Sequence, residues 1–257
     1  LGLAGGLERA GAAEPGSQPA REVDPKAAEL LRTVFQSYRS LKSYRHRETV
    51  TEVRVRNSGR VPETSEQDYY RQLIFERPNR IFLRSAWLIL GCDGRRMIAY
   101  YPRLAQYTDR PAPAKLTDDD IARATMEDRI DLITTALISD DALADILRRV
   151  DTVRLGLPVV EAGRTLRAVD FTAGQDNGTV LIDEANNLIT SVVVRPGGLP
   201  SGLAMTLTVT YEDIRLNESS KAETFVVEPA EFARKVRRVS RSRRDDYPLL
   251  GKPLPAV

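Results

Sequence analysis

The sequence contains many predicted β-strands, which form two long blocks on either side of one helical region. The first block opens with strict apolar–polar alternation over residues 44–56, and the second contains the β-branched run NLITSVVVR over residues 187–195. The predicted strands cover residues 44–56, 66–77, 80–90, 95–101, 104–108, 152–156, 164–173, 178–184, 187–195 and 203–215. Turns such as Cys92-Asp93-Gly94 separate them, which predicts consecutive antiparallel hairpins, and Glu223–Pro229 is expected to form a last edge strand.

Helical patterns precede and divide these strand blocks. Asp24 is a suitable cap for a helix with Pro25 in its first position, and apolar residues recur at helical spacing to about Lys42. Residues 117–150 carry two further apolar stripes with a break near Ser139, which predicts two short helices. The order helix, strands, helices, strands predicts an α+β fold with an antiparallel sheet.

A large antiparallel sheet curves because β-sheets twist. The only docking surface that the pattern offers the helices is one face of that sheet. We therefore predict an incomplete antiparallel β-barrel, with the helices covering its concave face and an apolar cavity between the two layers. No apolar run approaches the ~18 residues of a membrane-spanning helix.

Several classes of site are excluded by residue counts. The chain has one cysteine, Cys92, and one histidine, His46, which excludes an internal disulfide, a multi-cysteine metal cluster and catalytic schemes with two imidazoles. Asp118, Asp119 and Asp120 are consecutive at a predicted helix start, where they complement the helix dipole better than they would surround a metal ion. We predict no catalytic residue, no metal ligand and no cofactor.

Charge divides the chain into three parts. Residues 1–23 are predicted to be a flexible leader that includes the possible remnant of an export signal. Residues 24–232 are predicted to form one domain, and residues 233–257 a basic, proline-containing tail. Residues 234–257 carry eight Lys or Arg against two Asp, a net charge of +6, while residues 1–233 carry 30 positive and 34 negative charges. The acidic body does not indicate nucleic-acid binding. The tail is either a solvated linker or a contact for anionic phospholipid or another protein.

Short motifs from residue 24 to residue 230 resemble those of one protein superfamily. They are Asp24-Pro25 leading to Leu41-Lys42-Ser43-Tyr44, the segment Glu76–Arg80, Cys92-Asp93-Gly94 followed by Tyr100-Tyr101-Pro102, and the closing Phe225 to Pro229. In this order they resemble the outer-membrane lipoprotein carrier (LolA-like) superfamily, particularly its periplasmic branch. That resemblance implies a periplasmic protein with an incomplete antiparallel barrel closed by helices. The best-known members hold acyl chains in the cavity.

The end of the chain carries a second resemblance. Leu249–Val257 is similar to the segment that leads into thioredoxin-like redoxin domains. This similarity implies that a redoxin domain follows residue 257, and that the present chain is a sensor or interaction module attached to it. An ordinary proline-rich terminus explains the same residues equally well.

We predict a monomeric, exported, non-enzymatic binding domain for a lipid or an acylated protein. The candidate cavity lining is made of large apolar residues of the predicted strands: Leu73, Phe75, Ile81, Leu83, Trp87, Ile89, Met97, Tyr101, Leu181, Val192, Met205 and Leu207. The same side chains can instead make a filled core. Because a slip of one residue exchanges the two faces of a strand, the inward face of each strand also stays open. The alternatives are the redoxin-linked sensor and a hydrolase that uses a pair of carboxylates.

Overall fold

The structure is a computed structural model that describes residues 21–57, 61–125, 131–161 and 163–239. The predicted signal remnant and the redoxin-like segment lie outside these residues. Glu22 and Val23, which were expected to belong to the leader, form a short strand instead.

The helices are α1 (Pro25–Ser40), α2 (Asp118–Thr125), α3 (Leu132–Ile138) and α4 (Ala142–Leu147), with 3₁₀ turns at Pro102–Leu104 and Ala222–Phe225. The strands are β1 (Glu22–Val23), β2 (Ser43–Arg56), β3 (Glu63–Glu76), β4 (Arg80–Arg84), β5 (Ile89–Asp93), β6 (Arg96–Tyr101), β7 (Gln106–Pro111), β8 (Thr152–Leu155), β9 (Val159–Glu161), β10 (Arg164–Ala173), β11 (Asp176–Asp183), β12 (Leu188–Arg195), β13 (Leu203–Leu216) and β14 (Arg234–Lys235).

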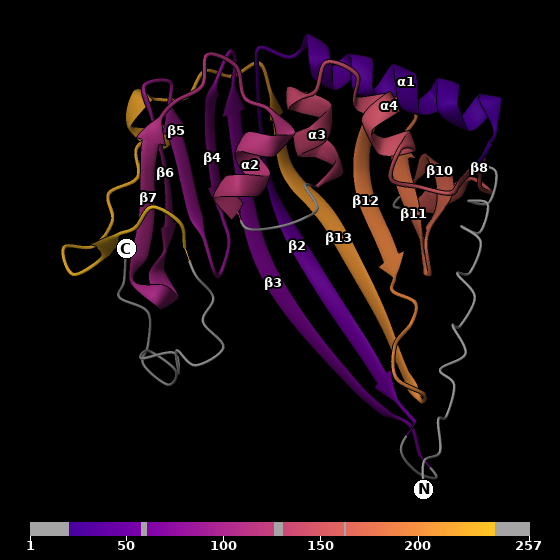
Figure 1. Cartoon of the computed structure of the whole chain (residues 1–257). Helices are drawn as coiled ribbons and strands as arrows, with labels where there is room; N and C mark the ends of the chain where they lie inside the picture. The colour runs from indigo at the N-terminus through magenta and orange to yellow at the C-terminus, as the bar shows by residue number, and fades with distance from the viewer. Residues whose placement is uncertain (1–20, 58–60, 126–130, 162, 240–257) are drawn as a thin grey trace, which may run out of the picture.

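All these strands belong to one sheet, in the order β1-β8-β10-β11-β12-β13-β2-β3-β4-β5-β6-β7-β14, with β9 paired to β10. Every neighbouring pair is antiparallel except the short edge pairs β1–β8 and β14–β7. The sheet is large and curved, and it is not closed into a barrel (Figure 1). The prediction of a strand-rich α+β fold built from hairpins is confirmed.

Residues 80–90, predicted as one or two strands, form parts of two, because Ser85 to Leu88 make a turn in which the Ser85 amide donates to the Leu88 carbonyl at 2.9 Å. Two other local predictions differ from the structure. The described residues of 117–150 form three short helices instead of two. The predicted edge strand over Glu223–Pro229 is a 3₁₀ turn followed by an extended segment.

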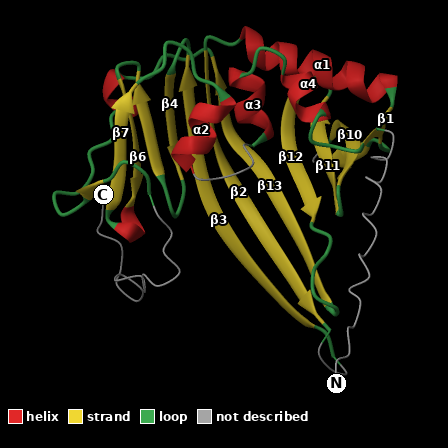
Figure 2. Cartoon of the chain, viewed as in Figure 1, coloured by secondary structure: helices red, strands yellow, loops and turns green. Residues whose placement is uncertain are grey.

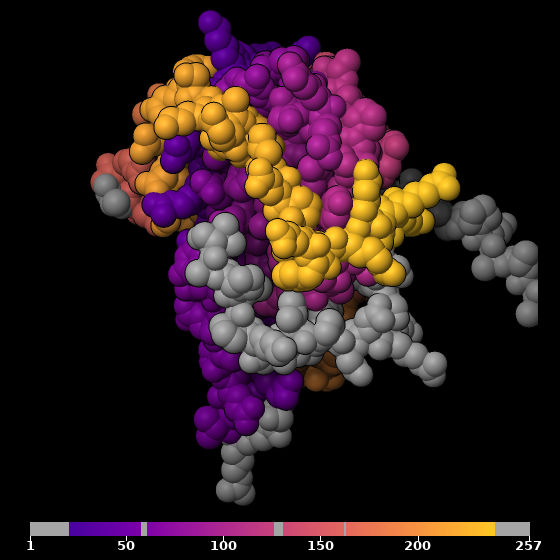
Figure 3. Space-filling view, turned by 90° about the vertical axis from the view of Figure 1, so that its left-hand side faces the viewer, coloured from indigo at the N-terminus to yellow at the C-terminus, as the bar shows by residue number. Residues whose placement is uncertain are grey.

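This segment after β13 crosses the outer face of the sheet, seen as an orange-to-yellow band in Figure 3. It passes so close to Gly91 that a Cβ atom there would lie 2.5 Å from the Val227 side chain and 2.6 Å from the Phe225 carbonyl oxygen. Phe225 and Val227 are buried. A glycine in β5 therefore makes room for the crossing segment.

The helices lie on the opposite side of the sheet (Figure 2). The Asp24 carboxylate caps α1 by accepting from the Lys26 amide at 2.8 Å, and Pro25 occupies the first position, as predicted. α1 runs across the sheet and contacts β8, β12, α3 and α4, while α2 contacts β6. Apolar residues of α1, α3 and one sheet face form the main core, and a smaller cluster around Ile98, Tyr100 and Val227 lies on the other face.

Arg77 attaches the helices to the β2–β7 half of the sheet. Its guanidinium donates to the carbonyl oxygens of Leu41 at 2.8 Å, Arg39 at 2.8 Å and Leu137 at 2.9 Å. These carbonyls lie at the C-terminal ends of α1 and α3, where intrahelical donors are lacking. One partly buried cation thus donates to carbonyls at both helix ends.

Candidate functional site: an apolar cavity under the helices

A row of small apolar residues crosses the helix-facing side of the second half of the sheet. Register pairs Leu155 with Val169, Val169 with Val180, Val180 with Val192 and Val192 with Val209. Cross-strand partners project from the same face, so these side chains form one continuous apolar strip. The strip faces the underside of α1 and α4.

A cavity of about 490 Å³ lies between this strip and the helices. Val153, Val169, Val180, Val192 and Val194 form part of its floor. Its roof is built by Leu31 of α1, Leu132 of α3, Ile146 of α4 and Val150, and its other lining residues are Phe171, Ala173, Arg149 and Asp176. The volume lies within the range of pockets that bind small molecules, and all but two lining residues are apolar.

Phe171 owes its position to a glycine on the neighbouring strand. Gly178 pairs with Phe171, and a Cβ atom on Gly178 would lie 2.5 Å from the phenyl ring. The ring therefore lies over the backbone of β11 and leaves the rest of the cavity open. Phe171 is half-buried, unlike the fully packed Phe75 in the first half of the sheet.

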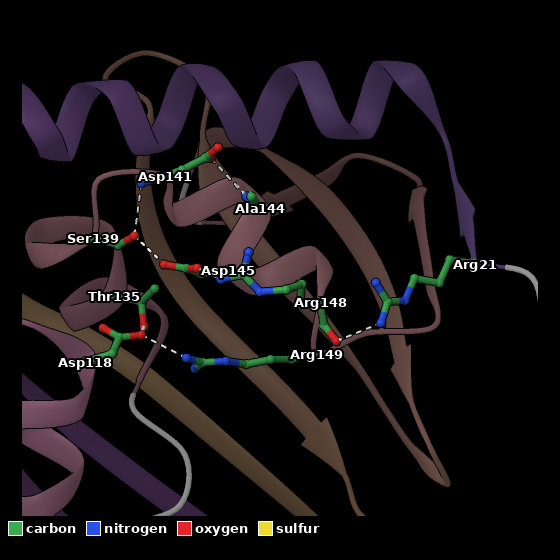
Figure 4. Close-up of polar contacts among 9 residues, drawn as sticks. All are labelled: Arg21, Asp118, Thr135, Ser139, Asp141, Ala144, Asp145, Arg148 and Arg149. Carbon is green, nitrogen blue, oxygen red and sulfur yellow. Dashed lines mark hydrogen bonds and ion pairs between the residues drawn. The ribbon is translucent and has the colours of Figure 1, made fainter. Parts of the chain in front are cut away.

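Polar contacts at the surface hold α4 over the cavity (Figure 4). Asp141 caps the helix by accepting from the Ala144 amide at 3.0 Å, and Ser139 donates to Asp145. Arg149, which follows the helix, donates to the Asp118 carboxylate of α2 at 2.8 Å. This ion pair links the segment after α4 to α2.

Asp118 is only partly satisfied by its neighbours. Its Oδ2 atom accepts from Arg149 and, at 3.4 Å, from the Thr135 hydroxyl. Its Oδ1 atom is buried and accepts no hydrogen bond. Arg149 is 41% exposed, so its guanidinium is open to solvent at the edge of the cavity.

A buried polar cluster lies at the middle of the sheet, on β2 and β13. His46 Nδ1 lies 3.1 Å from the Tyr44 hydroxyl, and its Nε2 atom lies 3.7 Å from Glu48. Glu48 also pairs with Arg71 at 3.3 Å, and the Tyr211 ring packs edge-on against His46 at 5.0 Å. Residues 44, 46 and 48 are alternate residues of β2, so their side chains project from the same face of the sheet. This period-two spacing is the feature of the sequence that indicates the cluster.

Burial governs the ionisation of this cluster. Burial raises the pKa of Tyr38 to about 12 and raises the pKa values of Tyr44 and Tyr211 as well, so all three remain neutral. Burial and the nearby Glu48 carboxylate raise the pKa of Asp131. Asp131 caps α3 by accepting from the Thr134 amide at 2.9 Å. The residue that begins this helix is therefore a carboxyl group whose ionised form is disfavoured by its surroundings.

Nine of the twelve predicted lining residues project from the helix-facing side of the sheet. Five of them are at most 4% exposed and are packed into the main core: Leu73, Phe75, Ile81, Met97 and Tyr101. Leu83 packs against that core, and Val192 lines the cavity. Met205 and Leu207 are half-buried on β13, where Leu207 pairs with Val194 of the cavity floor.

The remaining three predicted residues lie elsewhere. Ile89 pairs with Tyr100 and joins the small cluster on the outer face. Leu181 lies at a β-bulge between Leu181 and Ile182 and lines a groove of about 750 Å³ on the outer face. Trp87 is 48% exposed in the turn after β4, with the Arg103 guanidinium 3.9 Å above its ring. Strand parity and turn geometry, which the sequence left open, account for all three.

Helix residues complete the cavity, and sequence reasoning did not select them. Leu31 belongs to the predicted apolar stripe of α1, and Ile146 to that of the last helix, so the helical pattern already contained the signal. Cys92 is fully buried, and burial raises the pKa of its thiol, in agreement with a structural residue. Among the described residues no group of three or more His, Cys, Asp or Glu is arranged to hold a metal ion, and no helix is long and apolar enough to cross a membrane.

Comparison with known proteins places the chain in a family. Residues 27–238 match the family model described as "Predicted periplasmic protein (DUF2092)". The chain belongs to the DUF2092 family. The match covers most of the chain, and the protein is periplasmic. No curated protein matches the sequence.

Several solved structures are similar to this DUF2092 protein at low sequence identity. Lipoprotein LppX of Mycobacterium tuberculosis is 11% identical with a TM-score of 0.38, over 77% of this chain and 99% of that one. A LolA superfamily protein of Nitrosomonas europaea is 12% identical with a TM-score of 0.32, over 78% and 97%. The MucA/MucB complex of Pseudomonas aeruginosa is 11% identical with a TM-score of 0.32, and the match spans 79% of this chain but 61% of that one. At these scores the similarities carry no functional argument.

Proposed function

We propose that this DUF2092 protein is a periplasmic binding protein that holds the acyl chain of a lipid or an acylated protein in the cavity under α1, α3 and α4. The observation that carries the proposal is the cavity of about 490 Å³ with eleven apolar lining residues. The lining includes Val192, one of the residues predicted from sequence to contact the ligand. The proposed role is binding and not catalysis, with the helices acting as a cover over the curved sheet.

Burial of apolar surface supplies the binding energy. Each methylene moved from water into the cavity contributes about 0.8 kcal/mol. Relative to a bilayer the gain is close to zero, because the chain is already in an apolar environment there. Loading and release therefore depend on opening of the cover or on transfer to a partner.

Two matched variants of the full chain test this proposal. Val192→Phe places a larger side chain in the cavity, whereas Val193→Phe places the same side chain on the outer face of the same strand. Each protein is purified from a periplasmic expression host, extracted with organic solvent, and the extract is analysed by mass spectrometry. We expect acylated molecules with the unsubstituted protein and with Val193→Phe, and a clear loss with Val192→Phe.

Two results contradict the proposal. Extracts without acylated molecules, combined with no uptake of added lipid by the purified protein, exclude an acyl ligand. Equal lipid content in the two variants places the ligand outside the cavity. Circular dichroism of each variant confirms that it is folded before the comparison is made.

A further inference from the structure

The cavity has a charged group at one side of an apolar lining, and this asymmetry suggests the type of ligand. Among the residues that the structure describes, Arg149 and Asp176 are the two charged ones that line the cavity, and Asp176 accepts from the Gly197 amide at 3.0 Å in a turn. Arg149 instead lies at the edge of the roof, 41% exposed, next to Ile146 and Val150. An amphiphile with its chain in the cavity can thus present its head group to Arg149.

The present partner of Arg149 uses little of its donor capacity. A guanidinium carries five N–H donors in a planar fork that matches a carboxylate or a phosphate bidentately. The Asp118 contact is made through a single carboxylate oxygen at 2.8 Å, and the other oxygen faces buried protein without a donor. An incoming anion can therefore take the place of the Asp118 carboxylate on the Arg149 guanidinium.

We propose that Arg149 binds the anionic head group of a single-chain amphiphile, a carboxylate or a phosphate monoester, in place of Asp118. This inference rests on the proposed function and adds to it the charge of the ligand and the residue that recognises it. When the head group displaces the Asp118 carboxylate from Arg149, the link between α2 and the segment that follows α4 is also broken. Ligand binding is thereby coupled to the contact between Arg149 and α2 (Figure 4).

Three probes with the same alkyl chain separate head-group recognition from chain binding: dodecanoate, dodecyl phosphate and dodecan-1-ol. Each is titrated calorimetrically into the full chain at neutral pH. We expect the anions to bind about tenfold or more tightly than the alcohol, the usual range for hydrogen bonds to a charged group. A stronger preference for the phosphate assigns the site to phosphorylated lipids, and equal binding assigns it to either anion.

Variants at two adjacent arginines provide the matched test. In Arg149→Gln the anion-to-alcohol affinity ratio falls to about one, since the charge and the fork are both lost. Arg149→Lys retains the charge without the fork and gives an intermediate ratio. Arg148→Gln keeps the original ratio, because Arg148 pairs with Asp145 and does not line the cavity. Asp118→Asn raises the ratio several-fold by removing the competing carboxylate.

The outcomes distinguish this inference from the proposed function. If none of the three probes binds, the proposed acyl-chain site itself is wrong. If all three bind equally, or if Arg149→Gln and Arg148→Gln change the ratio to the same extent, the chain site stands and the role of Arg149 is overturned.

Discussion

The two halves of the sheet meet the helices in different ways. Beneath the helices, the β2–β7 half presents Phe75, Ile81, Leu90 and Met97, all at most 1% exposed. The β8–β12 half presents mainly valines, together with the half-buried Phe171, and leaves a cavity of about 490 Å³. One alternating pattern therefore produces either a filled core or an open site, depending on side-chain volume along the strands.

The first and largest expected difference comes from removing a phenylalanine from each half. Phe75→Ala is expected to lower the free energy of unfolding by about 3–5 kcal/mol, because it opens a cavity in a close-packed core. Its loss also removes the contact with the Arg77 guanidinium, 5.4 Å from the ring centroid. Phe171→Ala is expected to cost roughly 1–2 kcal/mol, since its ring already borders empty space.

Urea unfolding followed by circular dichroism measures both changes. Equal losses for the two variants would mean that the second half is packed as tightly as the first. That result would also remove the physical basis of the proposed binding site.

The second prediction concerns Asp131, which lies near the junction of the two halves beside Glu48. Asp131→Asn is expected to stabilise the protein at neutral pH, because asparagine retains the α3 cap and removes a buried charge. A raised carboxyl pKa in the folded state means that the unsubstituted protein loses stability as pH rises from the ordinary Asp pKa of 3.8 through the raised value. Each tenfold change in proton affinity corresponds to about 1.4 kcal/mol.

Unfolding measured from acidic to neutral pH checks this sign. The two proteins should have the same stability below pH 3.8, where Asp131 is protonated in both states, and should diverge above it. An Asp131→Asn variant that is less stable at neutral pH would show that the carboxylate is required as an ion.

The sequence predicted the elements better than it predicted the cavity. Turns at residues such as Asp93 and Gly94 fixed the hairpins, and Asp24-Pro25 fixed the start of α1, since these depend on local backbone preferences. Nine of twelve selected residues project toward the helices, but only Val192 lines the cavity. Whether a strand face is covered tightly or loosely depends on where short helices such as α4 dock, and that is a property of the whole fold.

Most residues predicted to line the cavity have large side chains, which tend to fill the space around them. Phe75, Met97 and Tyr101 were chosen for their apolar surface, and for the same reason they are buried in the core. The cavity floor consists of smaller residues such as Val153 and Val180. A search for strands rich in valine opposite a short helix would have located the cavity more accurately.

The smallest expected effects concern the two ends of the sheet, each formed by a two-residue parallel strand with an ion pair. Lys235 of β14 lies 2.7 Å from Asp109, whose side chain is 12% exposed, and Arg96 and Lys235 together lower the pKa of Asp109 to about 2. Arg154 of β8 lies 2.5 Å from Glu22, but both side chains are about 60% exposed. Solvent screens the second pair more strongly.

Lys235→Ala is therefore expected to lower the free energy of unfolding by about 0.5–1 kcal/mol, and Arg154→Ala to leave it unchanged within error. The Lys235 effect should be present at neutral pH and disappear as pH falls through about 2, where Asp109 becomes protonated. Hydrogen exchange of the Arg234 and Val236 amides, which donate to Ala105 and Tyr107, provides a local measurement at this edge. Faster exchange in Lys235→Ala alone means that the ion pair holds β14 against β7, whereas unchanged exchange means that these backbone hydrogen bonds suffice.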